Sequence, residues 1–241
     1  KTLAWRLNLP LVGVNHLEGH LYSNWLEQGE DIKFPAICLI ISGGHTQLLF
    51  LKDQHKCKLL GETRDDAVGE AFDKIARLLD LGYPGGPAID KVSQDGDPNA
   101  FKLPRPMLAS ADFDFSFAGL KTAVLYLTKK MSPEEIKQQT SHIAASAQQA
   151  MVDTLAAKTK KAVEQFGAKT VLVAGGVAAN RKLREELPKT LPKTSVFFPS
   201  QGLNTDNAVM IALAAYFKFL KSRNKKFSWQ EVEANANLTL A

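Results

Sequence analysis

The last third of the chain alternates apolar strand-like runs with helical stretches, and this order constrains the fold most strongly. Strands are expected at 170–174 and 195–198, and helices at 178–187 and from 207 to about 221. Strand–helix–strand–helix order requires parallel pairing, because each helix returns the chain to the same end of the sheet. Ligands are then expected at the carboxyl ends of those strands.

Residues 36–60 predict an antiparallel meander on the same sheet. The apolar run Ala36–Ile41 is followed by a glycine turn and by extended runs at 47–51 and 58–60. Antiparallel strands followed by parallel strands with intervening helices predict an α/β lobe of the actin-like or sugar-kinase-like type.

Shorter features complete the expected secondary structure. We expect a buried strand at 10–14 and a helix that Asp65–Asp66 caps. Ser132–Glu135 has the pattern of a capping box and predicts a helix that continues to about residue 165. The stretch 98–117 is rich in Pro, Asp and Phe, which predicts an irregular excursion over the surface.

The composition is that of a globular chain. The 241 residues are 45% hydrophobic and 23% charged, and no stretch has the length and apolarity of a membrane-spanning helix. One of the two cysteines, Cys38, lies within an apolar run, so a disulfide framework is not expected. No membrane association and a cytoplasmic location follow as expectations.

The net charge of +5 reflects clusters of lysine and arginine. Such clusters could bind RNA or another polyanion, or could be solvated helix faces. They lie at 158–161, 181–184 and 218–226.

His16 and His20 are four residues apart, which places both imidazoles on one face of a helix. A zinc peptidase would need glutamate directly after the first histidine, and Leu17 stands there. Asp206, at the start of the last helix, is the expected third ligand. Two imidazoles and a carboxylate suit zinc or ferrous iron and leave positions open for a substrate. The alternative is that Asp206 only caps its helix.

Two glycine turns could hold a phosphate-bearing ligand. Ser42–Thr46 joins two expected strands, so it could be an ordinary hairpin turn or a phosphate cradle. Gly175–Asn180 follows a buried strand and could bind an anion or allow close strand-to-helix packing. Asn180 faces the same crevice and could bond a ribose or a base.

Asp73 and Asp90 lie on either side of the helix-breaking stretch 82–87. They could be solvated helix acids, or they could bond sugar hydroxyls beside Gly86. Their spacing does not decide between these alternatives.

Seven ordered motifs resemble the TsaD family, the tRNA N6-adenosine threonylcarbamoyltransferases. They are VNHLEGH, SGGHT, DDAVGEAFDKIARLL, YPGGP, DFSFAGLKTAV, GGVAANRKLR and TDNAVMIA. The resemblance extends from the first residues almost to the last.

The resemblance implies an α/β, actin-like (ASKHA) fold and a transfer of the threonylcarbamoyl group from threonylcarbamoyl-AMP to N6 of adenosine 37. The acceptors would be tRNAs that read codons beginning with A. One divalent metal ion, with Fe²⁺ favoured over zinc, would be bound by His16, His20 and Asp206. The residues lining the substrate-binding site would be Leu39, Ile40, Ile41, Ser42, Gly43, Asp73, Gly86, Asp90 and Asn180. No catalytic residue is assigned beyond the metal ligands.

The resemblance also implies partners and a domain organisation. The partners would be tRNA, threonylcarbamoyl-AMP, a degenerate paralogue and an ATPase. The family begins with a strand and a glycine- and acid-containing loop that do not occur here, so the first of two lobes is expected to be incomplete at its N-terminus. Residues 1–35 would be the remnant of that lobe with the metal-binding helix, 36–205 the second lobe, and 206–241 C-terminal helices that return toward the first.

Two alternatives to an active transferase remain. The chain could be a truncated or degenerate scaffold of the same tRNA-modifying complex, for which the missing N-terminal segment argues. A kinase of the same fold group is disfavoured, because such kinases do not need a paired-histidine metal site.

Overall fold

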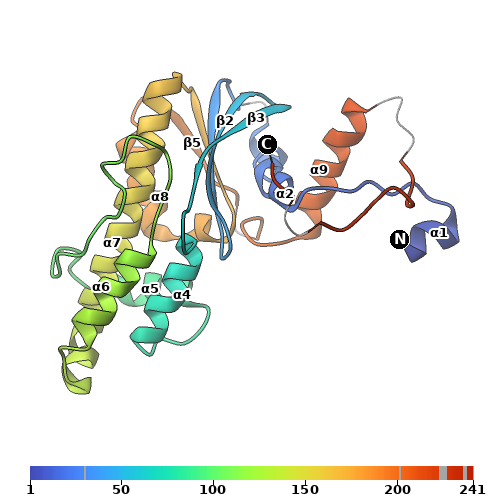
Figure 1. Ribbon diagram of the computed structural model, residues 1–241. Helices are drawn as coiled ribbons and strands as arrows, with labels where there is room; N and C mark the ends of the chain where they lie inside the picture. Colours follow the sequence, from blue (N-terminus) through green and yellow to red (C-terminus); the bar gives the residue numbers. More distant parts are fainter. Residues whose placement is uncertain (30, 201, 223–226, 236–237, 241) are drawn as a thin grey trace.

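A single mixed sheet organises the computed structural model, which describes residues 1–29, 31–200, 202–222, 227–235 and 238–240 (Figure 1). The strand order is β3-β2-β1-β4-β5. The central strand β1 pairs antiparallel with β2 and parallel with β4, so both predicted pairings are confirmed. The strands are β1 (Ala36–Ile41), β2 (Thr46–Asp53), β3 (Lys56–Glu62), β4 (Thr170–Ala174) and β5 (Ser195–Phe197).

Strands β1 and β4 are buried on both faces of the sheet, which explains their continuous apolar sequences. Successive side chains of a strand point to opposite faces. Ile37 and Leu39 therefore enter one hydrophobic core, whereas Cys38 and Ile40 enter the other.

A layer of helices covers the first face of the sheet (Figure 1). Its longest member, α7, begins at the predicted capping box: Glu135 N–H donates to Ser132 Oγ, and Ser132 N–H donates to the Glu135 carboxylate. The layer contains α4 (Val68–Leu78), α5 (Gly85–Val92), α6 (Ala118–Thr128), α7 (Pro133–Phe166), α8 (Arg181–Thr190) and the short 3-10 helices η1 (Ser93–Asp95) and η2 (Gly176–Ala179).

The opposite face is covered by α2 (His16–Tyr22), with α3 (Trp25–Gln28) after it and α9 (Ala208–Lys221) packed on its outer side (Figure 1). A Cβ atom on Gly19 would lie 3.0 Å from Ile211 Cδ1, so glycine lets the two helices approach closely. The Phe217 ring lies 4.8 Å from that of Tyr22. These contacts bring the last helix beside the histidine-bearing helix.

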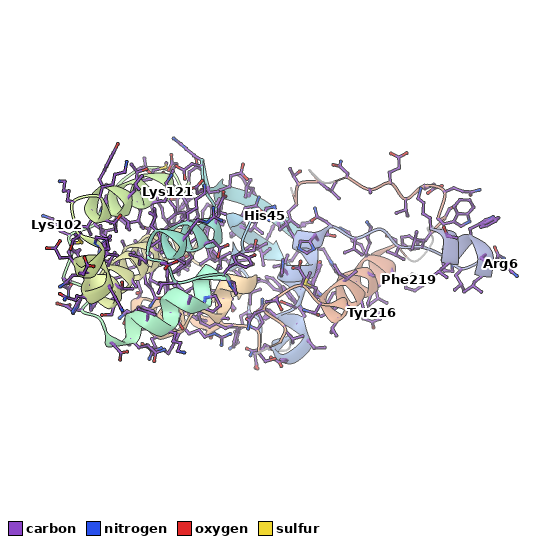
Figure 2. The ribbon with its side chains drawn as sticks, turned by 90° about the horizontal axis from the view of Figure 1, so that it is seen from below. Arg6, His45, Lys102, Lys121, Tyr216 and Phe219 are labelled. Carbon is purple, nitrogen blue, oxygen red and sulfur yellow. The ribbon has the colours of Figure 1, made fainter. Side chains whose placement is uncertain are left out.

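Helix α1 (Thr2–Leu7) lies apart from the sheet in both views (Figures 1 and 2). The strand expected at 10–14 is wrong: this segment is extended but joins no sheet in the described part of the chain. A strand needs a partner for its backbone groups. Here Gly13 C=O accepts instead from Lys218 Nζ on α9, at 2.6 Å.

The predicted role of Asp65 and Asp66 as caps of the following helix is also wrong. The hydroxyl of Thr46, on β2, accepts from Val68 N–H at the start of α4. Asp65 instead accepts from the N–H groups of Phe117 and Ala118, and thereby caps α6. A cap supplied from far along the chain leaves no local sequence pattern, and the adjacent aspartates gave a false one.

The irregular excursion at 98–117 is confirmed, and Phe113, Phe115 and Phe117 are buried as their alternation predicted. A lysine on α7 holds it. The side chain of Lys158 is only 1% exposed, and its Nζ donates to Ser110 Oγ at 2.6 Å and to Asp112 C=O at 2.9 Å.

Replacing Lys158 with methionine should lower the free energy of unfolding by about 1–3 kcal/mol, because the half-buried acceptors Ser110 Oγ and Asp112 C=O each lose a donor. Chemical denaturation measures this change. The matched control is Lys160→Met, because Lys160 is an exposed neighbour whose Nζ lies 3.9 Å from Glu164 Oε1. Equal unfolding midpoints for the two variants would show that Lys158 does not anchor the excursion.

Among the described helices, none combines the length and apolarity needed to cross a membrane.

Candidate metal centre and adjacent glycine turns

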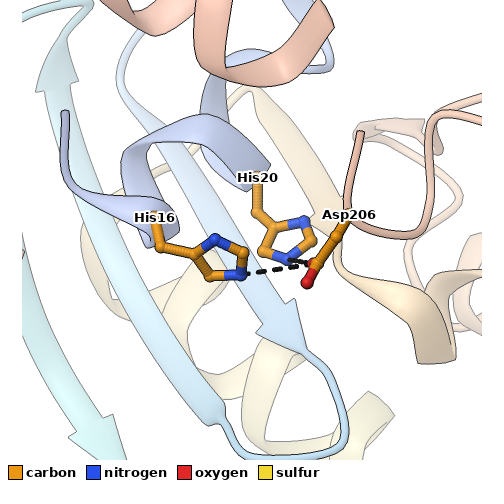
Figure 3. Close-up of side chains that lie close together, drawn as sticks. All are labelled: His16, His20 and Asp206. Carbon is orange, nitrogen blue, oxygen red and sulfur yellow. Dashed lines mark ion pairs between the residues drawn. The ribbon is translucent and has the colours of Figure 1, made fainter. Parts of the chain in front are cut away.

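Three side chains from two distant parts of the sequence converge beside α2 (Figure 3). Asn15 caps α2 by accepting from Leu17 N–H, which starts the helix at the first histidine. The Nε2 atoms of His16 and His20 each lie 3.2 Å from Asp206 Oδ1. The three ligand atoms all lie within 4.8 Å of one another.

The three side chains differ in burial. His20 is 2% exposed, whereas Asp206 is 74% exposed. Burial, reinforced by His16, lowers the pKa of His20 below its ordinary value, although Asp206 opposes this shift. The neutral imidazole is the form that binds a metal ion, so burial favours the ligating form.

Asn207, rather than Asp206, caps the last helix: its Oδ1 accepts from Met210 N–H at 2.9 Å. The capping alternative for Asp206 is therefore wrong. Its carboxylate points away from its own helix and toward the two imidazoles (Figure 3).

The donor set fits a divalent metal ion. Two imidazole nitrogens and one carboxylate oxygen are typical of zinc and ferrous sites that leave positions open for a substrate. These three residues therefore form a group that could hold one divalent ion.

The turn between β1 and β2 is a hairpin whose glycines are open to solvent. Ser42 N–H donates to His45 C=O, and His45 N–H donates to Ser42 Oγ. A Cβ on Gly43 or Gly44 would meet no atom within 4 Å. Hydrogen bonds among the described residues leave both glycine N–H groups unused, so they can donate to an anion.

The second glycine turn lies directly against the first. Gly175 has a φ of +90°, and a Cβ on it would lie 2.4 Å from the carbonyl oxygen of Ile41, the last residue of β1. Next to it, Gly176 approaches Thr205, whose Cγ2 lies 3.9 Å from the position of a Cβ. The turn therefore connects the hairpin to the loop that carries Asp206.

Three of the expected substrate residues belong to β1 and are completely buried: Leu39, Ile40 and Ile41. Their side chains pack in the two cores and do not reach the surface. They support the hairpin turn from below, so only Ser42 and Gly43 of this run present atoms to solvent.

Asp73 and Gly86 meet at the start of α5. Asp73 Oδ1 accepts from Gly85 N–H at 2.7 Å, and a Cβ on Gly86 would meet no atom within 4 Å. The structure thus places Asp73 at a helix N-terminus beside an open glycine, rather than as a solvated helix acid.

Asp90 and Asn180 form a second pair. Asn180 Nδ2 donates to Asp90 Oδ1 at 3.3 Å, and Asn180 Oδ1 caps α8 by accepting from Leu183 N–H. Burial raises the pKa of Asp90, although hydrogen bonds from the N–H groups of Arg181 and Lys182 oppose this shift.

His45 belongs to the Ser-Gly-Gly-His-Thr turn, but the sequence alone assigned it no role in the site. Burial and the neighbouring His16 lower its pKa. His16 and His45 line the same cavity of about 1160 Å³, between α2 and the segments 227–235 and 238–239. The pairs Asp73–Gly86 and Asp90–Asn180 do not line that cavity.

Comparison with known proteins identifies the family. The family model for tRNA N6-adenosine threonylcarbamoyltransferase (TsaD) matches residues 1–213. Proteins of that name from Thermosipho africanus and Clostridium botulinum are each 48% identical to this chain, over 223 and 244 aligned positions. The alignments cover 92% and 100% of this chain, and 67% and 70% of those relatives.

Solved structures show the same fold at low identity. The HypF protein of T. kodakarensis superimposes with a TM-score of 0.70 at 16% identity, over 92% of this chain and 39% of that one. A full-length HypF in a phosphate- and nucleotide-bound form gives a TM-score of 0.65 at 14% identity, over 91% of this chain and 45% of that one. The α/β fold is thus of the actin-like type, and the chain belongs to the tRNA N6-adenosine threonylcarbamoyltransferase family.

Proposed function

We propose that this chain transfers the threonylcarbamoyl group from threonylcarbamoyl-AMP to N6 of adenosine 37 in tRNAs that read codons beginning with A. The observation that carries the proposal is the convergence of His16, His20 and Asp206 beside two glycine turns. Membership of a transferase family supports the reaction type. The scaffold alternative is not favoured, because the complete ligand set is present and the relatives are named as transferases.

His16, His20 and Asp206 would hold one divalent metal ion, for which we favour Fe²⁺ over zinc. When bound, the ion would supply Lewis-acid polarisation of the carbamoyl carbonyl group. His20 is held rigidly by burial, whereas the exposed Asp206 carboxylate can adjust to the ion.

The glycine turns would hold the adenylate part of the donor. The unused N–H groups of Gly43 and Gly44 are suited to the phosphate. We assign sugar hydroxyls to Asp73 and Asp90, with Gly86 leaving space beside them. Leu39, Ile40 and Ile41 would contribute only through the strand that supports the turn.

The reaction breaks the bond between the carbamoyl carbon and the phosphate oxygen, and forms a bond between that carbon and the adenine N6. AMP leaves with the bonding electron pair, and the attacking amine loses one proton to solvent. No covalent nucleophile is needed among the described residues, so positioning and electrostatic stabilisation would provide most of the rate.

A tRNA substrate would meet a basic surface, to which the exposed Lys160 of α7 and Arg181 of α8 would contribute. Lys158, from the same cluster as Lys160, is buried and would not contribute. Arg223, Lys225 and Lys226, from the third basic cluster, lie outside the described residues. We also propose a cytoplasmic location, where tRNA is modified, and two partner proteins, a degenerate paralogue and an ATPase.

We further propose the two-lobe organisation expected from the sequence, in which residues 1–35 and 206–241 belong with a first lobe and residues 36–205 form a second. The packing of α9 on the outer side of α2 supports grouping these two helices, and Leu17 and Leu21 of α2 join the group to β1 and β4.

Incubating the chain with threonylcarbamoyl-AMP, unmodified tRNA and the partner proteins should yield threonylcarbamoyladenosine in digested tRNA, measured by mass spectrometry. The matched control is a tRNA with guanosine at position 37, which should remain unmodified. If no product forms in either reaction, with all partners present or with the chain alone, the transferase function of this chain is refuted.

A further inference from the structure

Gln148 lies in the middle of α7 and is buried, with an exposed fraction of 3%. Its side-chain amide has a partner on each side: Nε2 donates to Ser93 Oγ at 2.9 Å, and Oε1 accepts from Asn180 Nδ2 at 2.9 Å. A buried amide is costly unless both of its ends are bonded. Gln148 meets this requirement by linking η1 to the start of α8.

The bonds continue from both partners to Asp90. Ser93 Oγ donates its one proton to Asp90 C=O at 3.0 Å, and Asn180 Nδ2 donates to Asp90 Oδ1 at 3.3 Å. Gln148, Ser93, Asp90 and Asn180 therefore form a closed ring of hydrogen bonds.

The ring also determines which way each amide faces. Since the Ser93 hydroxyl proton is used on Asp90 C=O, Ser93 Oγ must accept from the Gln148 NH₂ group. The Gln148 carbonyl oxygen then faces Asn180, which must present its own NH₂ group. Gln148 thus fixes which way the side-chain amide of Asn180 faces.

This arrangement assigns different tasks to Asp90 and Asn180. Asn180 is 8% exposed; its NH₂ group donates to Gln148 and Asp90, and its oxygen accepts from Leu183 N–H. Its polar atoms are therefore engaged within the protein. Asp90 is less buried, and its carboxylate is the member of the ring that can also accept from a ligand hydroxyl.

We propose that Gln148 is a positioning residue of the donor site, which holds Asn180 and the backbone of Asp90 so that the Asp90 carboxylate faces the hydroxyls of a nucleotide ribose. The inference rests on the proposed function, because it takes Asp90 to lie in the adenylate site. Nothing in the sequence pattern around Gln148 indicates this role.

Isothermal titration with AMP, the product that the proposed transfer releases, tests the inference on the purified chain. Replacing Gln148 with leucine keeps the side-chain size and removes both bonds, and should raise the Kd for AMP about tenfold, equivalent to about 1.4 kcal/mol. The variant Ser93→Ala removes one link of the same ring and should raise the Kd in the same direction by a smaller factor. It serves as the measurement if the leucine variant does not fold.

The matched control is Ser146→Ala, on the same helix. Ser146 is completely buried, and its hydroxyl bonds Phe101 N–H and Asp97 C=O, so its loss disturbs the helix surface without touching the ring. Its Kd for AMP should stay within about twofold of the unchanged chain. Thermal unfolding of each variant separates loss of stability from loss of affinity.

A double variant shows whether Gln148 acts through Asn180. Adding Gln148→Leu to Asn180→Ala should weaken AMP binding by a smaller factor than Gln148→Leu does in the unchanged chain, because one of the two hydrogen-bonded paths from Gln148 to Asp90 is already absent. Unchanged AMP affinity of Gln148→Leu, or additive losses in the double variant, would overturn the positioning role. No AMP binding by the unchanged chain would instead refute the adenylate site itself, and the inference with it.

Discussion

The double variant His16→Ala/His20→Ala should lose its bound divalent metal and its transferase activity, because two of the three ligand atoms are removed. Metal content measured by inductively coupled plasma mass spectrometry should fall to background, and formation of threonylcarbamoyladenosine should fall by at least about 100-fold. His20 is buried, so this variant is also expected to be less stable.

Asp206→Asn separates metal binding from stability. Asp206 is 74% exposed and does not cap α9, so its replacement should reduce metal content while leaving the unfolding transition of the metal-free chain unchanged. The matched control is His55→Ala, since His55 is exposed in the turn between β2 and β3, away from the centre. If Asp206→Asn, the double variant and His55→Ala all contain the same amount of metal, the metal centre is ruled out.

Gly175→Ala should have the largest effect on stability, lowering the free energy of unfolding by about 3 kcal/mol or more. The φ of +90° is unfavourable for alanine, and the new Cβ would lie 2.4 Å from the backbone oxygen of Ile41. Backbone atoms cannot turn aside as a side chain can. Either β1 or the second glycine turn must therefore move, and activity should fall with stability.

The variant Gly167→Ala separates the cost of the positive φ from the cost of the close contact with Ile41. Gly167 follows α7 with a φ of +60°, and a Cβ there would meet no atom within 4 Å, so this variant carries the backbone cost alone. We expect a loss of about 1 kcal/mol, measured by chemical denaturation. If Gly175→Ala is no less stable than Gly167→Ala, the close contact with Ile41 is not important.

The sequence was sufficient to predict most of the sheet and the layer of helices, because these elements leave local patterns. Continuous apolar runs identified β1 and β4, and Ser132 with Glu135 identified the start of α7. The strand expected at 10–14 failed for a physical reason: apolar residues were present, but strand pairing depends on a neighbour that no local pattern reveals.

The candidate site was predictable where histidine spacing and glycine turns mark it, which is the case for His16, His20 and the two turns. The role of Asp206 required the fold, because a carboxylate before a helix is equally typical of a cap. Gln148 and Ser93 could not be found from the sequence, because neither belongs to a motif and their partners lie on other elements. The burial of Leu39, Ile40 and Ile41 likewise became clear only from the central position of β1.

The close approach of α9 to Gly19 has a consequence for how the two ends of the chain hold together. The histidines come from the beginning of the sequence and the carboxylate from near its end. A cation bound between them would therefore hold α2 and α9 together. By mass action, each tenfold excess of free ion over its Kd would add about 1.4 kcal/mol to the docking of α9 on α2. Depletion of the ion would then loosen the terminal regions first, while the sheet and its layer of helices keep their own core.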